Sequence, residues 1–166
     1  MYLIVTNNQL CLGKYGARIK MEYLEYGSYL DVLLKVRDYL HLGWKLETHP
    51  MTGSLKPNQT PFKSIMISNH SLDQEEFYSQ EITIENGIAA CRKFQSIRKT
   101  PDWPEHLLED FRIVDLVVFH VYISFRFVFS FLYSITKRSL CQDVFTSVLL
   151  GDGLVLVVGL EIGTAS

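Results

Sequence analysis

Metal-binding and disulfide patterns are missing from this sequence. Its 166 residues include three cysteines, Cys11, Cys91 and Cys141. They lie far apart and form no CxxC pair, and any disulfide scheme leaves one thiol unpaired. The five histidines do not approach HExxH or another zinc-ligand spacing. We therefore predict no structural metal and no cofactor, and we expect a reducing, cytoplasmic setting.

The glycine and serine motifs of several common enzyme classes are also absent. Neither GxxxxGK[ST] nor GxGxxG occurs, which excludes the usual P-loop and dinucleotide-binding signatures. The segment His70 to Asp73 contains the residue types of a hydrolase triad but no GxSxG turn, so we expect Ser71 to cap a helix there.

The chain has no large excess of one charge sign. Lys and Arg number 16 against 18 Asp and Glu, so the net charge of −2 gives no electrostatic argument for nucleic-acid binding. The apolar run Met1 to Thr6 lacks a basic segment before it and ends at Asn7, so we expect no secretory signal. We interpret a small basic cluster as a solvated helix face: Arg92, Lys93, Arg98 and Lys99.

Charge and proline are scarce in the last third of the chain. Only six of the 34 charged residues, and none of the five prolines, follow Asp115. We therefore predict two regions, a domain over residues 1–118 and an apolar tail over residues 119–166.

The sequence of the first region predicts alternating strands and helices. Short apolar or β-branched runs predict strands at residues 2–6, 19–24, 44–48, 62–68 and 112–118. Helical spacing predicts four helices, a weak one at 9–18, a clear one between Ser28 and Gly43, one over 71–97 and a short one at 105–111. Asn86 and Gly87 leave open whether the third helix is broken in two. This order predicts a single small α/β domain with a mainly parallel sheet flanked by helices.

The connection from His49 to Pro61 is the candidate functional segment. Thirteen residues are long for a connection in a small α/β domain, and three prolines restrict this one. Its hydroxyl and lysine side chains, with Lys63 just beyond it, are suited to surrounding a phosphate or carboxylate. The predicted anion-binding residues are His49, Gly53, Ser54, Lys56, Asn58, Thr60 and Lys63. A rigid structural loop with solvated lysines is the alternative.

Several segments together resemble one protein family. They are Thr6-Asn7-Asn8 after the first strand, Gly27 to Asp38, Thr48-His49-Pro50, Gly53 to Asn58, Thr60 to Ser64, Trp103 to His106, and Asp110-Phe111 with Asp115. Over about residues 1–118 the chain resembles the GrdX family, encoded beside the glycine, sarcosine or betaine reductase genes of anaerobic amino-acid fermenters. The resemblance implies a small cytoplasmic accessory protein of selenium-dependent amino-acid reduction, with reductase components as partners.

Two other functions remain open from the sequence. The first is a small enzyme that uses the same loop on a phosphorylated or carboxylated substrate, with His49 as acid or base. The second is a membrane-associated protein, and it rests entirely on the tail.

Three structures of the tail also remain open. Every odd position from Phe119 to Tyr133 is apolar, which favours extra strands. As a helix, Leu116 to Ile135 is a marginal transmembrane span because Arg126 lies within it, and a second apolar stretch from Val144 to Ile162 would complete a membrane hairpin. The third is an altered terminus, produced by a change of reading frame near codon 118.

Overall fold

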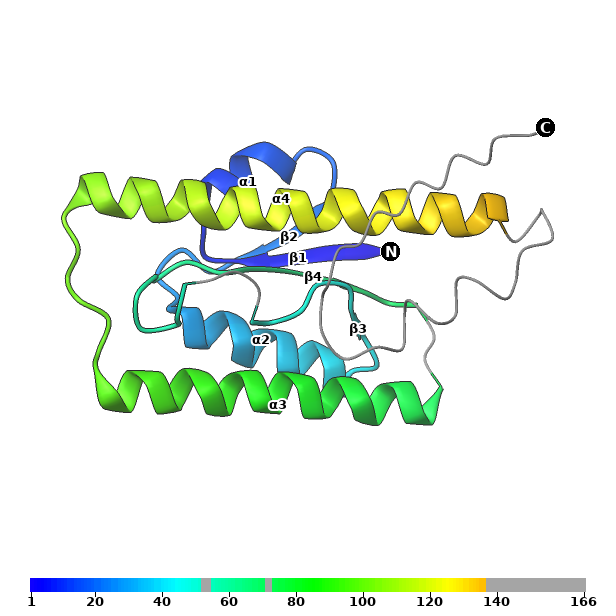
Figure 1. Ribbon diagram of the computed structural model, residues 1–166, viewed down its shortest axis with the longest axis horizontal. Coiled ribbons are helices and arrows are strands. Elements are labelled where there is room, and N and C mark those ends of the chain that lie inside the picture. Colours follow the sequence, from blue (N-terminus) through cyan, green and yellow to red (C-terminus); the bar gives the residue numbers. More distant parts are fainter. Residues whose placement is uncertain (52–54, 71–72, 137–166) are drawn as a thin grey trace, which may run out of the picture. The chain divides into compact units, whose positions relative to one another are not determined.

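The computed structural model describes residues 1–51, 55–70 and 73–136 of the chain (Figure 1). By its internal contacts the chain divides into two units, Met1–Phe125 and Arg126–Ser166. The first unit contains a complete α/β fold. The described part of the second unit is a continuation of one helix.

Four strands form one mixed sheet in the order β2-β1-β4-β3. The strands are β1 (Tyr2–Thr6), β2 (Lys20–Tyr23), β3 (Lys45–Leu46) and β4 (Ser64–Ser68), each within a predicted strand segment. β1 pairs parallel with β2, whereas β4 pairs antiparallel with both β1 and β3. The predicted α/β class is confirmed, but the prediction of a mainly parallel sheet is wrong. The reason is that the described residues between β3 and β4 contain no helix, and parallel neighbours need a crossover that usually contains one.

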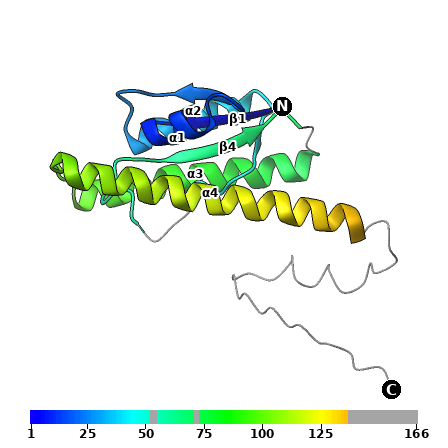
Figure 2. The same ribbon diagram turned by 90° about the horizontal axis from the view of Figure 1, so that it is seen from above.

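Helices cover both faces of the sheet, which explains why the central strands β1 and β4 are buried along nearly their whole length (Figure 1). Leu3 and Val5 of β1 face a core cluster formed with α2 (Tyr29–His41) and α3 (Gln74–Ile97). Ile4 faces a second cluster formed with α1 (Gln9–Tyr15) and α4 (Glu105–Thr136). In Figure 2, α3 and α4 run roughly along the direction of β1 and β4.

The helix α2 begins and ends as its sequence predicts. The Ser28 hydroxyl accepts a hydrogen bond from the Asp31 amide, and the Asp31 carboxylate accepts one from the Ser28 amide. This capping box satisfies two of the amides at the start of the helix. At the other end Gly43 adopts a φ of 85°, in the left-handed region that favours glycine.

The segment after β4 forms one helix rather than two. α3 is continuous through Asn86 and Gly87, and its N-cap is Asp73, whose side chain accepts a hydrogen bond from the Glu76 amide. Ser71, the predicted cap, lies outside the described residues. Gly87 is tolerated because it faces Pro50, where an added Cβ would lie 3.3 Å from the proline ring.

The helix α4 replaces a short helix and a strand that the sequence predicts separately. The predicted strand at 112–118 and the extra strands over 119–133 are wrong, since α4 is helical from Glu105 to Thr136. The segment is apolar on nearly all sides of the helix, so it satisfies a period of two as well as a helical period. Leu116, Phe119 and Ile123 decide the outcome by packing in the second core cluster.

The tail prediction of a membrane hairpin and the predicted domain boundary at residue 118 remain to be compared with the structure. Within the described part of the chain, no helix combines the length and apolar character needed to cross a membrane. The second apolar stretch, Val144 to Ile162, lies outside the described residues. The domain boundary at residue 118 stays a prediction, although α4 passes through it and buries Phe119 on its far side.

Candidate functional site

Polar side chains follow β1 directly and bind the neighbouring loops. The Asn7 side-chain amide donates to the carbonyl oxygens of Gly27 and Pro61, each at 2.8 Å, and its oxygen accepts from the Lys63 amide at 2.8 Å. One asparagine therefore joins the end of β1 to the segment before α2 and to the segment before β4. The carboxyl end of a central strand is where open α/β sheets usually place their ligands.

A carboxylate from α4 completes this edge of the sheet. Asp115 accepts hydrogen bonds from the Ser64 amide at 3.0 Å and the Ser64 hydroxyl at 2.7 Å. It also accepts one from the Asn8 side-chain amide at 2.9 Å, while Asn8 caps α1 by accepting from the Leu10 amide. Asp115 thus fixes α4 to the end of β1 and the start of β4, and it brings a negative charge to this edge.

Lys63 lies buried beside this network, with 3% of its surface exposed. Its ammonium lies 5.8 Å from the centre of the Tyr29 ring. Burial lowers the pKa of Lys63 from its ordinary value to about 8, against the smaller opposite effect of the Asp115 carboxylate. A lysine that changes charge near neutral pH is uncommon and is typical of functional positions.

His49 lies at the surface within the electrostatic reach of the buried lysine. Its side chain is exposed in part, and its Nδ1 accepts a hydrogen bond of 3.0 Å from the Met51 amide. Partial burial lowers the pKa of His49, and the nearby charge of Lys63 lowers it further. Tyr29, whose hydroxyl donates to the Pro50 carbonyl at 3.3 Å, has its pKa raised, chiefly by burial. We name Tyr29, His49, Lys63 and Asp115 the Lys63 cluster.

The middle of the predicted loop has other partners. The Asn58 side-chain amide donates to the carbonyl oxygens of Phe94 and Arg98, each at 3.2 Å, and so binds the C-terminal end of α3. The Lys56 ammonium lies 5.5 Å from the centre of the Phe94 ring. Thr60 is buried and its hydroxyl accepts from the Phe62 amide at 3.3 Å. The contacts of Lys56 and Asn58 therefore hold the loop against the end of α3, whereas the Thr60 contact lies within the connection to β4.

The seven predicted residues thus separate into three groups. His49 and Lys63 belong to one cluster, whereas Lys56, Asn58 and Thr60 have the structural contacts just described. Gly53 and Ser54 lie outside the described residues. Reasoning from the sequence did not place Asn7, Asn8 or Asp115 in a site, although two of the segments that resemble the GrdX family contain them.

Cysteine chemistry does not fit this edge of the sheet. Burial is the main cause that raises the pKa of Cys11 to about 12 and that of Cys91 to about 11. Both thiols therefore stay protonated at neutral pH, and a protonated thiol is a poor nucleophile. Among the described residues, no group of three or more His, Cys, Asp and Glu side chains is placed to hold a metal ion.

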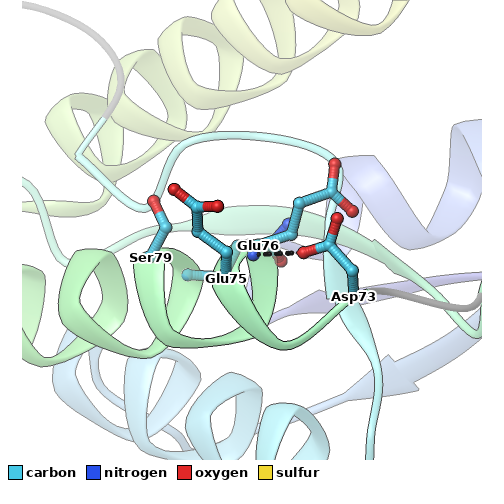
Figure 3. Close-up of a pocket in the computed structure, with 5 residues that line it drawn as sticks. Asp73, Glu75, Glu76 and Ser79 are labelled. Carbon is cyan, nitrogen blue, oxygen red and sulfur yellow. Dashed lines mark hydrogen bonds between the residues drawn. The ribbon is translucent and has the colours of Figure 1, made fainter.

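A shallow hollow of about 400 Å³ lies elsewhere, along the first turns of α3 (Figure 3). Its lining includes the carboxylates of Asp73, Glu75 and Glu76. Acidic side chains stabilise the start of a helix, so these residues have a structural explanation, and they would repel an anion. The hollow is therefore not the predicted anion site.

Comparison with known proteins gives one result. No curated protein and no solved structure matches the chain. A family model described as GrdX-like protein matches residues 3–124, which is well over half of the chain and ends within α4. The protein therefore belongs to the GrdX-like family.

Proposed function

We propose that this protein binds a small phosphate or carboxylate anion at the Lys63 cluster and acts as an accessory protein of glycine, sarcosine or betaine reductase systems. The anion site rests on one observation, the burial of Lys63 next to His49. The link to the reductases rests on family membership and on the context that the resemblance implies.

The burial of Lys63 gives a physical reason for anion binding. A buried ammonium group has lost most of its hydration, which is why the pKa of Lys63 falls to about 8. A bound anion would stabilise the charged form again. Binding near or above pH 8 would therefore be accompanied by proton uptake, and affinity would fall as the pH rises further.

His49 is suited to assist as a hydrogen-bond donor. A backbone amide only donates, so Nδ1 of His49 must act as the acceptor in its bond to Met51. The neutral ring then carries its proton on Nε2, which is free of this bond and can donate to an anion. This arrangement favours binding over the alternative of an enzyme with His49 as general base, because the unprotonated nitrogen already accepts a hydrogen bond.

Isothermal titration calorimetry with single-residue variants tests the anion site. We expect one of inorganic phosphate, acetyl phosphate, glycine, sarcosine or betaine to bind, and Lys63→Met to abolish that binding while Lys56→Met leaves it unchanged. At pH 8.5, titrations in two buffers of different ionisation enthalpy should show proton uptake. Equal loss of binding in both variants, or binding without proton uptake, would contradict the assignment to Lys63.

The reductase link needs its own experiment. We expect the full chain to bind at least one purified component of a glycine, sarcosine or betaine reductase in a sedimentation or interferometry assay. Absence of binding to every component, with and without the anion, would contradict this part of the proposal and leave the anion site unaffected.

A further inference from the structure

The solvent-facing side of α3 carries a regular row of residues. Six exposed positions are separated alternately by four and three residues, as in the seam of a coiled coil: Glu75, Ser79, Ile82, Asn86, Ala89 and Lys93. The opposite side of the helix buries Ile84, Ile88 and Cys91 in the first core cluster. The row therefore faces away from the fold, along the lower border of Figure 1. Ile82 is 61% exposed and Tyr78, at the flank of the row, is 62% exposed.

Charge is separated along this helix. Residues 71–91 contain no Lys or Arg, and residues 86–101 contain no Asp or Glu. The helix dipole accounts for acidic residues in the first turn, but its effect fades within about one turn. Lys93 lies before the last turn and, among the described residues, forms no ion pair, as is also true of Glu75. The row thus has an acidic end and a basic end with small or apolar side chains between them.

We infer that α3 pairs in antiparallel orientation with α3 of a second copy of this chain, through this row. A twofold axis that crosses the row at the height of residue 84 along the helix places Glu75 against Lys93 of the partner subunit. By symmetry, the same contact occurs again at the other end of the row. It places Ser79 against the partner subunit's Ala89, and Ile82 against the partner subunit's Asn86. In heptad terms the row alternates between d and a positions. Each of the three pairs joins a d position of one helix to an a position of the other, as in an antiparallel coiled coil. The small side chains let the helices approach closely.

A second copy fits this row better than an unrelated partner because the row is complementary to itself. A symmetric pair uses one surface twice, so each acidic group must find its basic group on the same helix of the other copy. Antiparallel pairing does this at two points about 27 Å apart, from 18 residues at about 1.5 Å each. Parallel pairing would place like charges together and is disfavoured. With few apolar residues in the row, the dimer should be weak and sensitive to salt.

Charge reversal in the full chain tests the dimer by sedimentation equilibrium. We expect a dimer at low salt that weakens at about 0.5 M salt, where the Debye length is only a few ångström. Glu75→Lys and Lys93→Glu should each raise the dissociation constant at least about tenfold, and the double variant should restore it. Two reversals of neighbouring charges outside the row, Glu76→Lys and Arg92→Glu, should have little effect.

The controls separate pairing from effects on the helix itself. Glu75 and Glu76 lie in the same first turn, so both reversals affect the helix dipole alike. A monomer at every concentration up to about 1 mM, the limit of weak association, would overturn the inference. So would a dimer whose dissociation constant the row variants leave unchanged, because another surface would then form it. Failure of the double variant to restore pairing would also overturn the antiparallel register.

Discussion

The two parts of the segment from His49 to Lys63 differ in how they are held. Its ends, at His49 and Lys63, belong to one electrostatic cluster at the carboxyl end of β1. Its middle is bound to the end of α3, by the Lys56 ammonium over the Phe94 ring and by two hydrogen bonds from the Asn58 side chain to carbonyl oxygens. A single polar loop thus combines a candidate site at its ends with a structural attachment to α3 in its middle. The two lysines make this plain, because one is buried and the other exposed.

Removal of Asp115 should have the largest effect of the changes that affect the cluster. Asp115→Ala leaves the Ser64 amide and the Asn8 side chain without their shared acceptor, which should cost about 2–4 kcal/mol of unfolding free energy. It also removes the carboxylate that favours the charged form of Lys63, so the pKa of Lys63 should fall further below 8. Urea unfolding measures the first effect. Asp110→Ala, on an exposed part of α4, should change stability by less than about 0.5 kcal/mol.

The buried lysine should make stability depend on pH. The pKa of Lys63 is about 8 in the folded protein and 10.5 ordinarily, so the unfolded chain binds more protons between these values. Unfolding free energy should therefore rise with pH in this window, by about 2 kcal/mol between pH 7 and 9.5. In Lys63→Met this rise should disappear. Urea unfolding of both proteins at several pH values checks it, and parallel pH curves would contradict the assignment.

Asn58 should matter for stability and not for anion binding. Asn58→Ala removes two hydrogen bonds to carbonyl oxygens at the end of α3, and we expect a loss of about 1–2 kcal/mol. Titration with the anion that binds the unaltered protein should give the same dissociation constant within about twofold. A large loss of binding would show that the middle of the loop belongs to the site after all.

Lys56 should give the smallest effect. Its ammonium contacts one face of Phe94 at an exposed position, so Lys56→Ala should lower the unfolding free energy by less than about 1 kcal/mol. Thermal unfolding at two salt concentrations measures this change. If Lys56→Ala weakened anion binding as much as Lys63→Met, the distinction between the two lysines would be lost.

Local patterns in the sequence predict part of this fold well. The buried runs in β1 and β4 and the capped helix α2 follow from periodicity and from Ser28. The direction of β4 does not, because strand direction depends on how the chain returns rather than on side chains. The prediction for residues 112–133 is wrong because apolar residues there lie on nearly all sides of the helix, so the segment fits a period of two as well as a helical period.

The candidate site shows the same division between local and long-range information. His49 and Lys63 could be found from the unusual length and composition of their loop. Asp115 could not be joined to them, since it lies 51 residues beyond Ser64 and reaches it only through the packing of α4. A carboxylate directly between Val114 and Leu116, where the apolar stretch of α4 begins, is the one local sign that it has a specific partner.

Gly87 makes α3 part of the geometry of the Lys63 cluster, although α3 contributes no side chain to it. The backbone of this buried glycine leaves room for the ring of Pro50, the residue next to His49. A methyl group there would lie 3.3 Å from the proline ring, so the ring would have to give by a few tenths of an ångström. The close approach of α3 to the residue next to His49 thus depends on the absence of one carbon atom on the helix. A shift of α3 along its axis would therefore be felt on both sides of the histidine, at Pro50 through this contact and at Leu46 through the Gln80 side chain, which accepts a hydrogen bond from the Leu46 amide.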